Sequence, residues 1–470
     1  MRGQTRSSRV VLVVLCTGLA LLAAAAGVVF VLSGNDARGE YSWPPPPPTL
    51  HGDLSVAPVP GWRTKLTDMV SATSPLRPHT LSIPSPLEAV PYLGNLGATG
   101  FFIAEEPRLR DKQWWLIAVN VDDGRPAFPP VLLSTTSEPP RCFLNVDSVL
   151  CLDDKGSPAT AKVVDVRSGR TSFEGPTDLR ADGADLSVRQ IGTFSVATTQ
   201  GRGVFGIGAL ASTTWFVPGE GDVPLAAPSD QSDTPSKLTT QSASDPRNSV
   251  KTVFSVQDGH VVSPQIEAGS RIERAVTYPG GFAAEVATAD GPTQVRLFDE
   301  AGRRLSDHGQ PGRLSTASLD YPIVEVDDGK WLVFAPDGIR IFEGDGKTPD
   351  GVRVVGDWLF ANLTTNSGFP EWQQYSWRTG AKGKVCEFDM MRRYRGSDGE
   401  VGVFAVENPQ AGVSAKGRRL STCDELWSLP ARPGSLTQVW RIGTVLVQLS
   451  DDGTELVSLV AARRTSDPGQ

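Results

Sequence analysis

Four cysteines are the side chains with the clearest chemistry in this sequence, and we expect them to form two disulfide bonds. Cys142 and Cys151 flank the turn-forming stretch NVDS, so two strands folded back there would bring their Cβ atoms within bridging distance. Four cysteines allow three connectivities, and we favour Cys142–Cys151 together with Cys386–Cys423. No CxxC motif occurs and the four histidines are scattered, so the spacing does not indicate a zinc site.

Two other patterns that could carry chemistry have a structural interpretation. Residues 201–206 match GxGxxG, but a strand-like segment follows where a dinucleotide-binding fingerprint requires a helix, so we interpret them as part of a hairpin turned at QGRG. Glu325, Asp327 and Asp328 lie in VEVDDGKW, a strand followed by a turn, with their carboxylates in solvent. No GxSxG, HExxH, Walker or EF-hand motif occurs. We therefore predict no catalytic, metal-binding or cofactor-binding residues.

The N-terminus carries an uncharged apolar segment, residues 10–32, preceded by three arginines. As a helix it would be roughly 34 Å long, enough for a hydrocarbon core of about 30 Å. The basic flank predicts a cytoplasmic N-terminus, a single-pass anchor in the cytoplasmic membrane and an extracytoplasmic C-terminal domain. Two alternatives remain open: a signal peptide cleaved near residues 24–26, and a lipoprotein acylated at Cys16.

Beyond this segment the sequence is typical of an all-β protein. Short runs rich in Val, Ile, Phe and Trp alternate with Asp-Gly, Gly-Gly and Ser-Gly turns, and no further stretch has a sustained helical period. The 48 Gly and 37 Pro residues also favour many turns. About 400 residues are too many for one β-sandwich of roughly 100 residues.

One strand–turn–strand unit recurs along the chain. AVNVDDGRPAF (118–128) and VVDVRSGRTSF (163–173) share a glycine in the turn and a phenylalanine four residues later. The segment WLVFAPDGIRIF is a degenerate third copy, and weaker copies surround Gly302, Gly380 and Gly453. Glycine supplies the positive φ that a tight hairpin needs. A repeat of roughly 40–50 residues has the size of one propeller blade.

We expect seven four-stranded blades, with eight as the alternative. Seven is preferred because segments 227–249 and 391–425 look like insertions that lengthen the chain. The early strand-like piece GWRTKL, from Gly61, otherwise has no partner, so we expect it to close the ring by pairing with the last blade, near residues 443–460.

The predicted organisation follows from these features. The ranges are a cytoplasmic basic tail (1–9), a transmembrane anchor (10–32), a Pro-rich stalk (33–54), the β-propeller (55–465) and a disordered tail (466–470). Five consecutive prolines in the stalk favour the extended polyproline II conformation, which would hold the propeller off the membrane.

The repeated strand–Asp-x-x-x-Gly-x-x-x-aromatic unit resembles that of the pyrroloquinoline-quinone-like (quinoprotein-like) β-propeller superfamily. That superfamily contains quinoprotein dehydrogenases and also cofactor-free propellers, such as the lipoprotein of the outer-membrane assembly machinery. The dehydrogenases would imply a central calcium site, a ring-stacking Trp and a pair of adjacent cysteines. This chain has no adjacent cysteines and no calcium ligand on a matched position, so we expect no cofactor and interpret the tryptophans as blade packing.

The composition narrows the functional classes. A net charge of −8 opposes binding to phosphate backbones, so we do not expect a nucleic-acid partner. Arg outnumbers Lys, and Ala, Val and Gly are abundant, which is typical of a high-GC bacterium such as an actinobacterium. We expect a binding or scaffolding protein of the cell envelope whose partner is an envelope protein or membrane subunit. The alternatives are a quinoprotein-type dehydrogenase or other envelope enzyme, and an accessory or sensor subunit of a membrane complex.

Overall fold

The computed structural model describes most of the chain after residue 42. The described residues are 43–44, 46–69, 81–84, 91–106, 112–156, 158–224, 236–243, 250–288, 291–306, 308–315, 321–363, 371–435 and 437–462. Pro44–Gln470 form one compact unit. The expected anchor, residues 10–32, lies outside the described residues. Among those that are described, no helix combines the length and the apolar character needed to cross a bilayer.

Antiparallel sheets make up this unit, and the first three after the N-terminal strand have four strands each. They are β2 (Tyr92–Leu96), β3 (Thr99–Glu106), β4 (Lys112–Asn120) and β5 (Val131–Thr136); β6 (Arg141–Asn145), β7 (Ser148–Asp153), β8 (Ala159–Asp165) and β9 (Thr171–Thr177); and β10 (Ser187–Ile191), β11 (Phe194–Thr199), β12 (Gly203–Ile207) and β13 (Thr213–Pro218). A two-stranded sheet of β14 (Leu238–Ser242) and β15 (Lys251–Ser255) follows.

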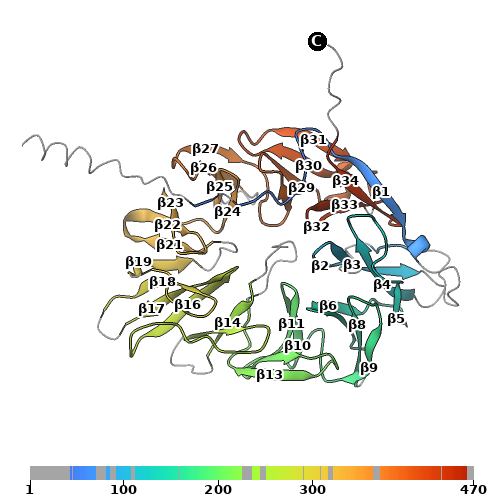
Figure 1. The fold of residues 1–470 in the computed structure, drawn as a ribbon, viewed down its shortest axis with the longest axis horizontal. Coiled ribbons are helices and arrows are strands. Elements are labelled where there is room, and N and C mark those ends of the chain that lie inside the picture. Colours follow the sequence, from blue (N-terminus) through green and yellow to red (C-terminus); the bar gives the residue numbers. More distant parts are fainter. Residues whose placement is uncertain are drawn as a thin grey trace, which may run out of the picture. The chain divides into compact units, whose positions relative to one another are not determined.

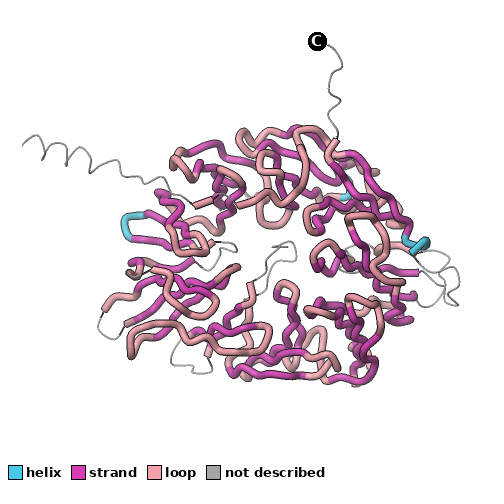
Figure 2. The backbone as a smooth tube through the Cα atoms, viewed as in Figure 1, coloured by secondary structure: helices cyan, strands magenta, loops and turns pink. Residues whose placement is uncertain are grey.

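Five more four-stranded sheets complete the described structure. Four are β16 (Arg271–Tyr278), β17 (Gly281–Ala287), β18 (Gln294–Asp299) and β19 (Gln310–Pro311); β20 (Arg313–Ser315), β21 (Ile323–Val326), β22 (Lys330–Phe334) and β23 (Arg340–Asp345); β24 (Val352–Val355), β25 (Trp358–Leu363), β26 (Glu371–Ser376) and β27 (Lys382–Cys386); and β28 (Tyr394–Ser397), β29 (Val401–Ala405), β30 (Val413–Arg419) and β31 (Glu425–Pro430). The fifth combines β1 (Val59–Lys65) with β32 (Val439–Ile442), β33 (Val445–Leu449) and β34 (Glu455–Val460). The helices in the described residues are short 3₁₀ turns, η1 (Leu66–Met69), η2 (Asp327–Gly329) and η3 (Pro409–Ala411), and Figure 2 shows how strands dominate the backbone.

The sheets follow one another around a ring (Figure 1). Each sheet contacts the next through buried side chains, which is why a middle strand such as β4 is buried from Gln113 to Val119 without alternation. Between the β20–β23 and β24–β27 sheets the contact is aromatic, with the rings of Trp331 and Phe342 lying 5.9 and 4.9 Å from that of Tyr375. This arrangement is a β-propeller, the predicted fold class.

The predicted number of seven blades is wrong. Eight four-stranded blades are described, the number held as the alternative, and the β14–β15 sheet occupies a further sector between β10–β13 and β16–β19. The error came from the two segments interpreted as insertions. Residues 227–249 include β14, and residues 391–425 include most of the β28–β31 blade.

The predicted closure of the ring is confirmed. β1 pairs antiparallel with β34, with Val59 opposite Val460 and Lys65 opposite Glu455. The outermost strand of the last blade therefore comes from the N-terminal end of the ring, and β34 is covered by β1 instead of forming the edge of its sheet.

The repeated turns adopt the expected backbone conformation. Gly124, Gly169, Gly302, Gly338 and Gly380 each lie between the third and fourth strands of a blade, and all have φ between 67° and 87°. Gly453, also with positive φ, differs because it lies between the second and third strands of its blade. GxGxxG residues 201–206 form the expected hairpin between β11 and β12, and VEVDDGKW forms β21, η2 and the start of β22.

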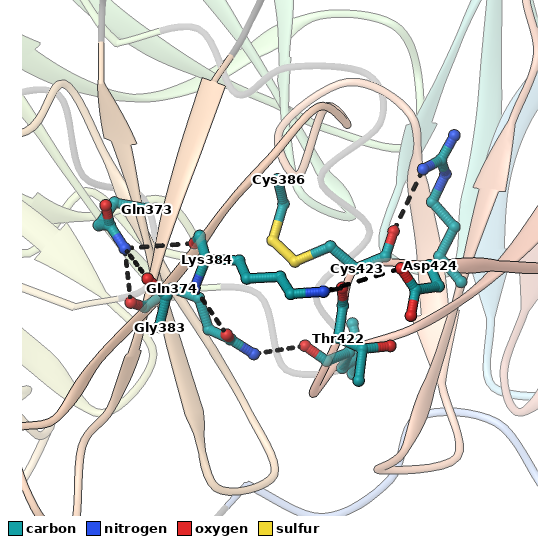
Figure 3. Close-up of a disulfide and its surroundings, with 10 residues drawn as sticks. Gln373, Gln374, Gly383, Lys384, Cys386, Thr422, Cys423 and Asp424 are labelled. Atoms are coloured by element: carbon teal, nitrogen blue, oxygen red, sulfur yellow. Dashed lines mark hydrogen bonds and ion pairs between the residues drawn. A yellow bond between two sulfur atoms is a disulfide. The ribbon is translucent and has the colours of Figure 1, made fainter.

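Both expected disulfide pairings are present. Cys142 and Cys151 are opposite each other in the β6–β7 hairpin, so their bond is local. Cys386, at the end of β27, is bonded to Cys423 in the turn between β30 and β31, so the second bond joins two neighbouring blades (Figure 3). Beside it, the Nζ atom of Lys384 donates a 3.2 Å hydrogen bond to the carbonyl oxygen of Thr422 across the same junction (Figure 3).

Candidate functional site

One face of the ring carries the features with binding potential, and we call it the hairpin face. It is the face that bears the turn between the first and second strands, and the turn between the third and fourth strands, of each blade. Neighbouring turns touch there: the amide of Val146 in the β6–β7 turn donates a 2.7 Å hydrogen bond to the carbonyl oxygen of Thr193 in the β10–β11 turn. The remaining turns lie on the opposite face.

The chain enters the ring on the hairpin face. The amides of Thr49 and Leu50 both donate 2.9 Å hydrogen bonds to the carbonyl oxygen of Ser397, at the β28–β29 turn. The amide of His51 donates to the carbonyl oxygen of Thr444, in the β32–β33 turn, at 3.4 Å. Residues 49–54, which we call the tether clamp, are therefore held across the turns of the last two blades.

Buried side chains reinforce the tether clamp. Leu50 and Leu54 are 3% and 2% exposed and pack between these two blades. The indole N–H of Trp427 donates a 2.7 Å hydrogen bond to the carbonyl oxygen of Leu54, and the Leu54 amide donates to Asp398 Oδ2 at 2.7 Å. We predicted that residues 33–54 form a Pro-rich stalk, but the structure holds residues 49–54 against the ring. The two leucines of TLHGDL are the sequence feature that indicates this contact.

A cleft of about 350 Å³ opens on the same face. Its walls come from the β6–β7, β10–β11 and β12–β13 turns, from β13 and from the residues after β15, so three neighbouring sheets contribute. The apolar lining consists of Val146, Phe194, Ile207, Ala209, Trp215 and Val256. Trp215 is held in place because its indole N–H donates a 3.2 Å hydrogen bond to the carbonyl oxygen of Gln257.

Several polar groups of the cleft already have structural partners. Asn145 donates from Nδ2 to the carbonyl oxygen of Ile207 at 3.0 Å and accepts the Ser195 amide at 3.2 Å. Hydrogen bonds from Ser168 lower the pKa of Asp165, whose carboxylate shapes the β8–β9 turn. The cleft is therefore suited to hold an apolar or aromatic side chain within a polar rim, and it offers no set of convergent acids for catalysis.

The cysteines predicted from the sequence lie around this face without forming a reactive centre. The Cys142–Cys151 bond joins the two strands of the β6–β7 hairpin, whereas the Cys386–Cys423 bond lies three to four blades away in the ring. Within the described part of the chain, no three His, Cys, Asp or Glu side chains are grouped so that they could hold a metal ion. Trp114, Trp331 and Trp377 are no more than 2% exposed and are packing residues, whereas Trp215 lines the cleft.

The ring of radial four-stranded sheets defines a β-propeller, and comparison with known proteins gives its family. Residues 35–462 match the conjugation-associated 9-bladed β-propeller domain. The chain belongs to this family, and nine blades agree with eight four-stranded sheets plus the β14–β15 sector. It is also 35% identical to an uncharacterized protein of Mycolicibacterium smegmatis (strain MKD8) over 476 residues, which is 97% of each chain.

Solved structures give more distant similarities. BamB from Moraxella catarrhalis has a TM-score of 0.40 and 11% identity, covering 87% of this chain and 99% of its own. Apo AztD from Citrobacter koseri has a TM-score of 0.29 and 12% identity, covering 63% of this chain and 85% of its own. Neither similarity carries information on ligand or partner.

Proposed function

We propose that this protein is a binding and scaffolding subunit of a conjugative DNA-transfer assembly in the cell envelope of an actinobacterium. The observation that carries the proposal is the match of residues 35–462 to a conjugation-associated propeller domain. The Mycolicibacterium relative supports the actinobacterial source. The repeated strand–turn unit of this chain supports a propeller of the quinoprotein-like type, and we propose that it works without the cofactor of the quinoprotein dehydrogenases.

In this proposal residues 10–32 anchor the chain in the cytoplasmic membrane and the propeller lies outside. The three arginines before the apolar segment support this orientation through the positive-inside rule. The two disulfide bonds also support it, because such bonds persist in oxidising compartments. The partner is then an envelope protein or another membrane subunit, and the wide faces of the ring supply the contact surface.

A transfer assay tests the role. In a donor that carries the conjugative element encoding this chain, deletion of the gene is expected to reduce transfer to the background of a donor without transfer functions. The full-length chain should restore transfer, whereas a chain lacking residues 10–32 behind a cleavable signal peptide should restore it poorly. Normal transfer from the deletion donor would refute the proposed role.

A second experiment tests the topology alone. A reporter enzyme that is active only in the cytoplasm, fused after Gln470, should be inactive in intact cells. An active fusion would refute the extracytoplasmic placement while leaving the propeller and its family unaffected.

A further inference from the structure

Five blades share the same two-residue hairpin between their first and second strands, and one of them departs from the others. Gly97, Gly192, Gly356 and Gly443 hold the first turn position with φ of 57°, 59°, 55° and 56°. In the β6–β7 hairpin the same position is occupied by Val146, with φ of 57°. The five hairpins share this backbone conformation, but in the β6–β7 hairpin a β-branched side chain adopts it.

Valine at this position should lower the stability of the fold. A β-branched residue at positive φ is strained, whereas glycine adopts this conformation freely. The Val146 side chain is 41% exposed, so it recovers little through burial. The turn is held by other groups, namely the hydrogen bond from the Val146 amide to Thr193 and the Cys142–Cys151 bond across the hairpin. Strain of this kind is concentrated at functional sites.

The exposed side chain lines the cleft on the hairpin face. Val146 stands on the β6–β7 turn, with Phe194 from the β10–β11 hairpin and Trp215 from β13 among the other lining residues. Exposed apolar side chains also concentrate on this face. Val56, Val59, Val146, Leu210, Val261, Ile339 and Val460 lie in its turns or at the adjoining strand ends, whereas Phe216 and Val385 lie on outer strands. The cleft is therefore a hollow in a partly apolar face.

The position of the tether clamp indicates which kind of partner the hairpin face can contact. The chain joins the ring at residues 49–54 on the hairpin face, and only residues 33–48 separate it from the end of the apolar segment. At no more than about 3.6 Å per residue this stretch reaches roughly 60 Å. If residues 10–32 span the membrane, as in the proposed function on which this step depends, the tether clamp on the hairpin face lies no more than roughly 60 Å from the outer side of the bilayer.

We infer that the cleft around Val146 binds an apolar side chain from an extracytoplasmic segment of an integral membrane protein of the same assembly. Val146, Phe194 and Trp215 contact that side chain, and the Asn145 and Asp147 rim faces the polar groups beside it. Exposed apolar surface rimmed by polar groups is typical of protein interaction sites. The retained strain at Val146 is then explained by binding.

Site-specific crosslinking in membranes tests this assignment. A photoreactive amino acid replaces Leu210, which is 61% exposed and adjoins the cleft residue Ala209, in the full-length chain. The expected product is an adduct with a protein that has a transmembrane segment of its own. The Val146→Gly variant should reduce the yield of this adduct at least fivefold and should melt at or above the temperature of the parent.

The matched control is Gly97→Val, which puts the same strained residue at the equivalent turn, where an added Cβ meets nothing within 4 Å. It should lower the melting temperature and leave the adduct unchanged. If Val146→Gly does not fold, Val146→Asn replaces it, because asparagine tolerates positive φ and removes the apolar group.

The outcomes are distinguishable. An unchanged adduct yield in Val146→Gly, an adduct with a second copy of this chain, or an adduct only with proteins lacking a membrane span would overturn the inference. If a probe at Gln200, in the β11–β12 turn of the opposite face, captures the membrane partner and the Leu210 probe does not, the proposed function stands and the cleft assignment fails. Capture from neither face by probe-bearing chains that restore DNA transfer overturns the cleft assignment, whereas the proposed function is refuted by normal transfer from the deletion donor.

Discussion

The last blade and the β14–β15 sheet add different contacts to the apolar packing that holds them in the ring. The last blade is built from both ends of the chain, with β1 added to β32–β34 and the tether clamp packed beside it. It is also fastened to the next blade, because the indole N–H of Trp62 donates a 2.7 Å hydrogen bond to the carbonyl oxygen of Val121. Its stability depends on contacts between residues that are far apart in sequence.

The β14–β15 sheet also packs through apolar residues, but it adds a buried polar side chain to these contacts. Gln241 is 0% exposed, and its Nε2 donates to the carbonyl oxygens of Val217 and Pro218 at 3.0 and 3.2 Å. Its Oε1 accepts the Gly221 amide at 3.1 Å. Both sectors are therefore joined by apolar burial, to which the last blade adds long-range strand pairing and the β14–β15 sector adds a satisfied polar side chain. The two sectors should therefore respond differently to substitution.

The largest effect is expected from removal of β1. Deletion of residues 55–66 from the full-length chain leaves β34 as a bare edge and exposes the apolar contacts of the last blade. We expect loss of a cooperative thermal transition, measured by circular dichroism in detergent. A deletion variant that melts like the intact chain would show that the β1–β34 pair does not hold the ring together.

The second-largest effect is expected from a substitution in the tether clamp. Leu54→Ala removes a side chain that is 2% exposed, so the free energy of unfolding should fall by about 3 kcal/mol. Val56→Ala is the matched control, because Val56 is 55% exposed and should change stability by less than about 0.5 kcal/mol. Equal urea midpoints for the two variants would mean that the clamp contributes no stability.

A smaller effect is expected in the polar sector. Gln241→Leu keeps similar bulk but leaves the Val217 carbonyl and the Gly221 amide without this partner, so we expect a loss of about 2 kcal/mol. Chemical denaturation measures it, and Gln200→Leu, at an exposed turn, is the control. A more stable Gln241→Leu protein would contradict the importance of the polar side chain.

The smallest effect is expected from the contribution of Asp222 to the pH dependence of stability. Burial raises the pKa of Asp222, but hydrogen bonds from Ser242 and the ammonium of Lys251 outweigh this and leave the pKa lowered. A lowered pKa stabilises the fold above the carboxyl's unfolded value, near pH 4, and this stabilisation is lost as pH falls through the folded value. Because Asp222 is partly exposed, solvent screening limits it to less than about 1 kcal/mol.

Asp222→Asn checks the sign of this effect. The variant should be slightly less stable than the parent at pH 7, and the difference should shrink below about pH 4. A difference that grows in acid would reverse the assignment, and Asp337→Asn, at an exposed turn, serves as a comparison for general charge effects.

Much of the architecture could be predicted because short local sequence patterns mark it. The glycine turns, the partnerless strand near Gly61 and the cysteines around NVDS identified the propeller, its closure and its disulfide pairs. The count of blades failed where strands are polar. Leu238 to Gln241 are buried in β14 although three of these four residues are polar, so the apolar alternation that marks a strand is absent. In β28, the polar residues Arg395 and Ser397 likewise interrupt the apolar alternation.

The candidate site could not be predicted in the same way. The cleft exists because turns from three sheets become neighbours, and that adjacency depends on the order of blades in the ring. Val146 looks like an ordinary turn-flanking residue until its hairpin is set beside those of Gly97, Gly192, Gly356 and Gly443. The sequence contains Val146, but only the structure shows which turn positions are equivalent to it and that glycine occupies them.

The pairing of Val59 with Val460 also sets the timing of assembly. The first strand to be synthesised must wait for the last one, so every blade can form before the ring can close, and contacts across such a sequence distance form slowly. During that interval β1 is an unsatisfied strand edge, open to pairing with other chains. Loss of only the final strand, Glu455–Val460, should therefore be as damaging to the nascent protein as loss of its first.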